Sequence, residues 1–160
     1  MIPKPYATFF KSIDPLIALW GASLFLLSPS TVTSSYLPPQ PLDPSTTHPA
    51  SHSSSSREQA YSLPLHGQIA GHLLSNALLS TFLLRATDSL KVWRIYQLGL
   101  LIVDVFLLYG TFSSYVVQGR LDPLTSWRVE DWGSVAITGG VGLARLSFLL
   151  GLGFPKTKSA

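Results

Sequence analysis

The chain has 160 residues, of which 46% are hydrophobic and only 12% are charged, and its formal net charge is +3. Soluble domains carry about 25% charged residues, so this composition excludes an ordinary water-soluble domain and indicates a small integral membrane protein. The absence of cysteine excludes disulfides, thiolate nucleophiles and cysteine-ligated metals. Lysine and arginine are scattered along the chain, which argues against nucleic acid as a partner.

The first apolar stretch covers residues 13–27 and is shorter than the ~20 residues that a membrane-spanning helix needs. It reaches that length only if residues 6–10 also belong to the helix, which would bring Asp14 near the lipid head groups. Asp14 followed by Pro15 is typical of an N-cap and a first helical turn. A cleaved signal peptide is the alternative, but the Asp-Pro pair and the lack of a small-residue cleavage site favour a retained segment over residues 1–27.

Residues 28–63 form a polar connection rich in Ser, Thr and Pro. Such a composition buries too little apolar surface to fold, so it predicts a disordered loop. His48 and His52 lie in it without carboxylate or thiolate neighbours. We interpret them as solvated loop residues, and we expect no metal site and no cofactor.

Three further apolar stretches cover residues 65–84, 92–112 and 133–154. With the first they predict an all-α membrane protein, a four-transmembrane-helix bundle in which residues 64–154 form a three-helix remainder and 155–160 a short basic tail.

The residues that punctuate these stretches predict where the helices begin and end. We expect Pro64 to begin the second helix, Thr87 and Asp88 to cap the third, Glu130 and Asp131 to begin the fourth, and Pro155 to stop it.

The segment between the third and fourth stretches holds "DPLTSWRVEDW". It predicts a short amphipathic turn at the membrane interface, anchored by Trp127 and Trp132. Lysine and arginine are more frequent on the side that holds both termini, which the positive-inside rule assigns to the cytoplasm. We take the endoplasmic reticulum as the default membrane, since the sequence shows no other targeting signal.

Polar side chains recur inside the apolar stretches. In the second stretch they follow every four residues and form one helix face, beside a ridge of small residues that allows close helix packing. In the third and fourth stretches they are seven residues apart. The set that we expect to form a ligand pocket or a structural polar network is Gln68, His72, Asn76, Gln97, Asp104, Thr138 and Arg145.

Asp104 and Arg145 are the charged residues in the interior of the last two stretches. A charge near the middle of a membrane costs ~2.5–3.5 kcal/mol on the lenient insertion scale, so such groups turn inward and pair. Antiparallel neighbouring helices would place Asp104 and Arg145 at similar depth, and we expect them to contact each other. Three roles stay open: a structural ion pair, a polar pocket with Asp104 or His72 as acid–base candidates, and a proton or ion path.

Three segments together resemble a known family: "IPKPYATFFKSIDPLIALWGA", "LKVWRIYQLGLLIVDVFLLYG" and "DWGSVAITGGVGLARLSFLLGLG". The chain resembles a fungal family of small four-helix integral membrane proteins that carries only a domain-of-unknown-function label. The long Ser/Pro connection departs from that family. The matching residues are Pro5, Tyr6, Phe10, Asp14, Pro15, Gly21, Trp93, Arg94, Asp104, Trp132, Gly133 and Arg145.

The resemblance supplies no catalytic residues. It implies a filamentous-fungal source and a context of lipophilic secondary metabolites such as terpenoids and polyketides. We therefore expect an accessory membrane protein that binds or presents an apolar intermediate, with the bilayer and pathway enzymes as partners. An intramembrane isomerase or cyclase and a small transporter or assembly factor are the alternatives. A protonated carboxyl would be needed for the enzyme, and Arg145 argues against it.

Overall fold

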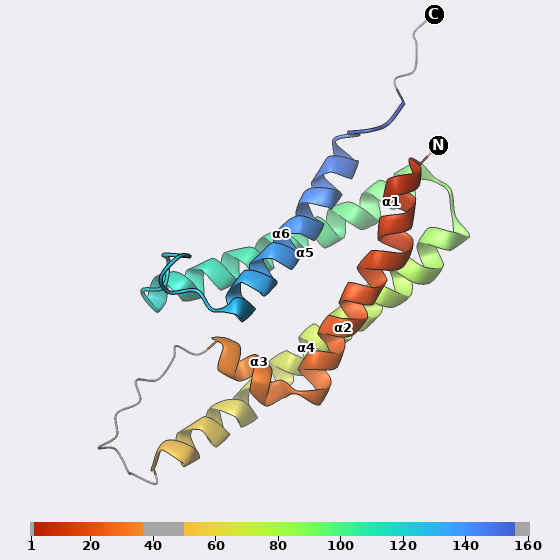
Figure 1. Cartoon of the computed structure of the whole chain (residues 1–160). Helices are drawn as coiled ribbons and strands as arrows, with labels where there is room; N and C mark the ends of the chain where they lie inside the picture. Colours follow the sequence, from red (N-terminus) through yellow and green to blue (C-terminus); the bar gives the residue numbers. More distant parts are fainter. Residues whose placement is uncertain (1, 37–49, 156–160) are drawn as a thin grey trace, which may run out of the picture. The chain divides into compact units, whose positions relative to one another are not determined.

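The computed structural model describes residues 2–36 and 50–155, and these residues form helices and connections without strands. Two compact units are present: residues 1–15 with 78–160, and residues 16–77. The helical elements in chain order are α1 (Lys4–Thr8), η1 (Phe9–Ile13), α2 (Asp14–Leu27), α3 (Pro29–Tyr36), α4 (Ala50–Ala86), α5 (Leu90–Val117) and α6 (Val129–Leu149) (Figure 1).

Three helical stretches are long and apolar enough to cross a membrane, namely Lys4–Leu27, Ser62–Ala86 and Leu90–Val117. The first includes α1, η1 and α2 and therefore does use residues 6–10, which gives it the length that residues 13–27 lack. The structure thus confirms three of the predicted spanning helices by length and composition. The predicted fourth, α6, is helical but is not among the three.

Asp14 is not the N-cap that the sequence predicts. Its φ of −57° and ψ of −46° are helical, and the chain passes through the π-helical turn η1 directly into α2. Pro15 has no N–H to donate to the carbonyl of Lys11 four residues earlier. Arg85 Nη2 donates to that carbonyl instead, at 3.2 Å. A side chain from α4 therefore supplies the hydrogen bond that the proline omits, and the helix continues.

Aromatic and aliphatic side chains form the core at one end of the unit of residues 1–15 and 78–160. Phe10, Leu84, Trp93 and Phe148 are fully buried together. Tyr6 packs edge-on against Phe148 with ring centroids 5.2 Å apart, and its hydroxyl donates to the Leu152 carbonyl at 2.9 Å. This packing brings the start of the chain against α5 and the end of α6.

Helices α5 and α6 pack against each other as an antiparallel pair (Figure 1). Each ends at a glycine with positive φ, Gly119 at 66° and Gly151 at 74°. The N–H groups of these glycines and of the next residues bond back to the last turn in the pattern of a Schellman motif. Helix α6 therefore ends at Leu149, before the predicted stop at Pro155.

The starts of these two helices agree with the sequence only in part. Ser89, and not Thr87 or Asp88, is the N-cap of α5, and it makes no capping hydrogen bond through its side chain. Glu130 and Asp131 do begin α6, where an Asp131 oxygen accepts from the Arg128 N–H at 2.8 Å.

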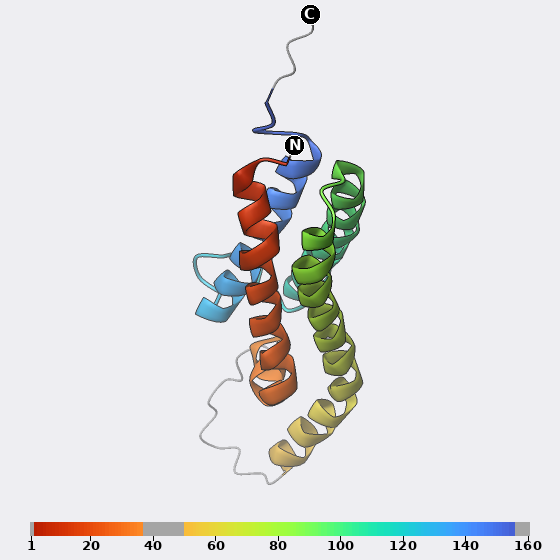
Figure 2. The same cartoon turned by 90° about the vertical axis from the view of Figure 1, so that its right-hand side faces the viewer.

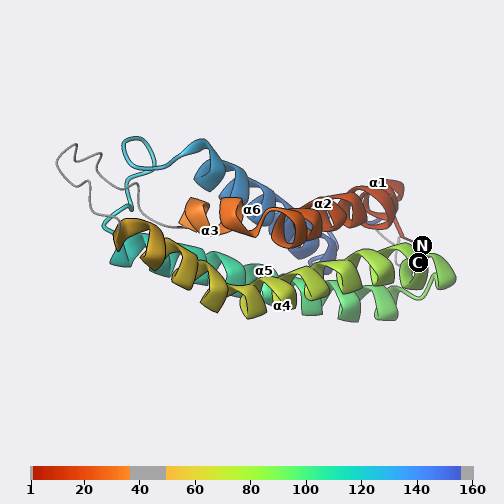
Figure 3. The ribbon, with the colours of Figure 1, turned by 90° about the horizontal axis from the view of Figure 1, so that it is seen from below.

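Residues 16–77 form the second unit, in which α2 and α4 lie side by side (Figures 2 and 3). A Cβ added at Gly21 would lie 3.1 Å from Leu73, so the glycine allows a close approach of these helices. The buried Ala18, Ala22 and Ala70 also have small side chains. Tight helix packing through small residues is typical of membrane proteins.

Within the range 28–63, for which the sequence predicts a disordered loop, the described residues are largely helical. Residues 29–36 form α3, and α4 begins at Ala50 and contains Pro64 in its interior. Thr33 Oγ1 lies 3.4 Å from Ser62 Oγ and 3.5 Å from His66 Nε2. These contacts give α3 and α4 partners that composition alone does not reveal. Residues 37–49, with His48, lie outside the described residues.

Candidate functional site: an ionic cluster between helices

Arg145 is the centre of an ionic cluster in the unit of residues 1–15 and 78–160. Its Nη2 donates to both carboxylate oxygens of Asp14, at 2.8 and 3.0 Å, and its Nη1 donates to Oδ2 of Asp104. The three residues are 3%, 2% and 7% exposed, respectively. The expected pairing of Asp104 with Arg145 is confirmed, and a second carboxylate joins it.

Each member of this cluster comes from a different part of the chain. Asp14 lies near the middle of the first candidate span, Asp104 near the middle of α5, and Arg145 in the second half of α6. A Cβ added at Gly142 would lie 3.5 Å from Asp104, so that glycine packs directly on the carboxylate. With all three groups ionised the cluster holds two negative charges and one positive charge. This geometry is suited to a structural role, in which the ion pairs fix the positions of three helical segments relative to one another.

Gln97 lies two helical turns before Asp104 on the same face of α5 and is a further polar residue beside the ionic cluster. It is fully buried, and in the part of the chain that the structure describes neither atom of its side-chain amide has a hydrogen-bond partner. On the adjoining face of α5, Tyr96 bonds through its hydroxyl to Ser80 Oγ of α4 at 3.0 Å. The interior next to the cluster is therefore polar.

A second ionic group lies where α5 and α6 are joined. Arg120 donates through Nη2 to Asp131, and the Tyr115 hydroxyl donates to the same carboxylate at 2.9 Å. Trp127 Nε1 donates to the Arg120 carbonyl at 3.0 Å. The connecting segment thus contains a turn, as the sequence predicts, and its position at a membrane interface stays a prediction. In this group Trp127 packs against Trp132 with ring centroids 4.9 Å apart.

The Asp122 carboxylate organises the tip of this turn. It accepts from the Thr125 hydroxyl at 2.7 Å and from the Leu124 N–H at 3.0 Å. These two hydrogen bonds lower the pKa of Asp122 below its usual value, because they stabilise the ionised form.

The other residues of the expected polar network are placed differently. Gln68 and His72 belong to the unit of residues 16–77, and both side chains are exposed on α4. Asn76 of the same unit is buried. Thr138, on α6, is partly buried one heptad before Arg145. The structure therefore brings together Asp104 and Arg145 from the expected set and leaves Gln68 and His72 facing outward.

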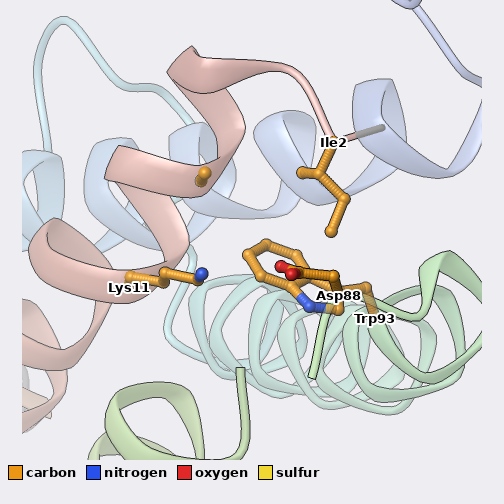
Figure 4. Close-up of a pocket in the computed structure, with 5 residues that line it drawn as sticks. Ile2, Lys11, Asp88 and Trp93 are labelled. Atoms are coloured by element: carbon orange, nitrogen blue, oxygen red, sulfur yellow. The ribbon is translucent and has the colours of Figure 1, made fainter. Parts of the chain in front are cut away.

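A pocket of about 450 Å³ opens at the end of the same unit where the chain begins. Figure 4 shows Lys11 extending toward Trp93, with Asp88 and Ile2 at the opening. The Lys11 ammonium lies 5.1 Å from the centroid of the Trp93 ring. The remaining lining residue is Ala7. Within the described residues, no three side chains of the metal-binding types gather as a metal site.

Sequence reasoning missed Asp14, because the Asp-Pro pair has the pattern of a helix start. The signal that could have found it is the length of the first apolar stretch: a helix long enough to span must begin near Lys4, and Asp14 then falls in its interior. No sequence pattern links the pocket residues Lys11, Asp88 and Trp93 to one another, since they meet only through the tertiary packing.

These features define a class: an α-helical chain with three candidate membrane spans and an ionic cluster buried among its helices. The chain belongs to the DUF7704 family, a domain of unknown function, whose profile matches residues 1–155. The match confirms the resemblance to a domain-of-unknown-function family, while the fungal source stays a prediction. No curated protein and no solved structure matches the chain.

Proposed function

We propose that the protein is a small multi-pass membrane protein with a non-catalytic accessory role, which holds or presents an apolar intermediate of a lipophilic-metabolite pathway. The observation that carries this proposal is the engagement of Arg145 by both carboxylates. A general acid needs a carboxyl group that is free to reach a substrate. Asp14 accepts from Arg145 through both carboxylate oxygens and Asp104 through Oδ2, so in this proposal the cluster serves to hold helices together.

The proposed topology has four crossings, with α6 as the fourth. Its 21 residues extend about 30 Å as a helix, which matches the thickness of the hydrocarbon layer. Arg145 is the charged group in its second half, and the two aspartates compensate that charge. The distribution of lysine and arginine supports cytoplasmic termini. The endoplasmic reticulum, the fungal source and the secondary-metabolite context rest on the sequence and its resemblance.

One observation favours a second candidate, an intramembrane isomerase or cyclase acting on a terpenoid- or polyketide-like substrate. The buried Gln97 amide has hydrogen-bonding capacity that no described residue uses, and an unpaired buried amide costs about 1–3 kcal/mol. A polar group of a ligand placed there would recover that cost. Nothing in the described residues favours the transporter or assembly-factor alternative over these two.

The test is a metabolite profile of the source organism with the gene deleted and then complemented by variants. Asp14→Asn, Asp104→Asn and Gln97→Leu are compared with Glu130→Gln, which changes an exposed carboxylate. Protein abundance in the membrane fraction is measured in parallel. For an accessory protein, the end product falls without build-up of one intermediate, and it falls in proportion to abundance. Accumulation of a single defined intermediate by a variant of normal abundance contradicts the proposal and supports the enzyme.

A further inference from the structure

The pocket at Lys11 lies where the candidate spans end. The first span begins at Lys4, the second ends at Ala86 and the third begins at Leu90. The pocket is lined from the beginning of the first helix, from the turn between α4 and α5, and from the first turn of α5. In a membrane this level corresponds to the head groups, where tryptophan and lysine are typical residues.

The lining combines both signs of charge with apolar surface. Lys11 contributes an ammonium group and Asp88 a carboxylate, while Ile2, Ala7 and Trp93 contribute apolar surface (Figure 4). Among the described ion pairs none joins Lys11 to Asp88, so the two charges face the same opening without neutralising each other at contact distance.

A second cation lies beside Lys11. The Arg85 guanidinium is held against the Lys11 main chain by the hydrogen bond to its carbonyl. Arg85 does not line the pocket itself, so the Lys11 ammonium is the cation that faces the opening. This ammonium attracts a phosphate, while the Asp88 carboxylate attracts a cation.

We propose that this pocket binds the head group of a zwitterionic phospholipid, with the phosphate at Lys11, the ammonium at Asp88, and the glycerol end against Ile2 and Ala7. A volume of about 450 Å³ is within the usual range for small-molecule sites. Asp88 makes the site selective, because a lipid with a phosphate but no ammonium leaves that carboxylate without a counter-charge. This site is independent of the accessory role proposed above.

The test is native mass spectrometry of the full chain released from detergent, titrated with phosphatidylethanolamine, phosphatidylcholine and phosphatidylglycerol that carry identical acyl chains. The wild type is expected to bind the two zwitterionic lipids at least about fivefold more tightly than phosphatidylglycerol. Lys11→Met is expected to weaken all three lipids about tenfold, and Lys11→Arg to restore them. Asp88→Asn is expected to remove the preference while leaving phosphatidylglycerol binding unchanged.

Matched controls are Lys91→Met and Glu130→Gln, which change exposed charges outside the pocket and are expected to bind as the wild type does. Circular dichroism checks that each variant is folded. If Lys11→Met is not folded, the proposal is judged by whether Asp88→Asn loses the preference for zwitterionic lipids. Equal or tighter binding of phosphatidylglycerol by the wild type overturns the proposal. So does binding of free phosphoethanolamine as tight as that of the lipid, which would identify a site for a soluble phosphate.

Discussion

The ionic cluster predicts a strongly non-additive pair of mutations at Asp14 and Asp104. In Asp104→Asn, Arg145 keeps both hydrogen bonds to the Asp14 carboxylate, so one positive charge still faces one negative charge. In Asp14→Asn, Arg145 keeps the Asp104 carboxylate. Each single change is therefore expected to lower the free energy of unfolding by only about 1 kcal/mol, in the range of one hydrogen bond.

The double variant leaves the buried guanidinium of Arg145 with no carboxylate. Removing the last partner of a buried charge costs about 3–5 kcal/mol, so the double variant should be destabilised by about 1–3 kcal/mol more than the two single variants together, a coupling of the size seen within one network.

The assay is reversible unfolding of the full chain in mixed micelles with an increasing fraction of sodium dodecyl sulfate, followed by circular dichroism. Asp88→Asn with Glu130→Gln provides the control pair, because both carboxylates are exposed, and their effects should be small and additive. If the Asp14 and Asp104 variants also add to within about 0.5 kcal/mol, Arg145 is not shared between them and the reasoning is wrong.

Three further predictions concern single contacts, each measured in the same unfolding assay. Arg85→Met should cost about 1–2 kcal/mol in the wild type but much less in a Pro15→Ala background, because alanine at position 15 supplies an N–H that can donate to the Lys11 carbonyl. Equal costs in both backgrounds would contradict this explanation of the continuous helix. Gly151→Ala should cost about 1–2 kcal/mol because of its positive φ of 74°, and a neutral result would show that this turn is not needed. Tyr115→Phe should cost about 0.5–1.5 kcal/mol through the lost bond to Asp131, whereas an effect near zero would mean that Arg120 and the Arg128 N–H satisfy that carboxylate without Tyr115.

The pairing of Asp104 with Arg145 could be predicted because it depends on two local quantities, helix length and helix direction. A charge inside an apolar stretch needs a partner, and antiparallel helices place these two at similar depth. The third member could not be predicted in the same way. Asp14 precedes a proline, which locally indicates a helix start. The continuous helix involves a π-helical turn and a hydrogen bond from the sequence-distant Arg85 to the Lys11 carbonyl, and neither has a local sequence signal.

The polar stripe of α4 shows a different limit. A spacing of four residues places Gln68, His72, Asn76 and Ser80 on one slowly turning face, but it does not determine which part of that face is covered. In the structure the last two are buried and the first two are exposed. Periodicity defines the face, and only packing defines which part of it is interior.

The missed Asp14 also changes the design of a rescue experiment. From the sequence, Asp104→Asn combined with Arg145→Gln should restore a protein whose ion pair is only structural. In the structure that combination leaves Asp14 buried without its guanidinium. Recovery is expected only when Asp14→Asn is added, because the triple variant is the first to leave no buried charge uncompensated.

Asp14 and Arg145 are separated by 131 positions along the chain. Synthesis from the N-terminus therefore makes the acid well before the base. In the proposed topology, the first helix is synthesised before its counter-ion, so the cluster can close only after α6 has been made.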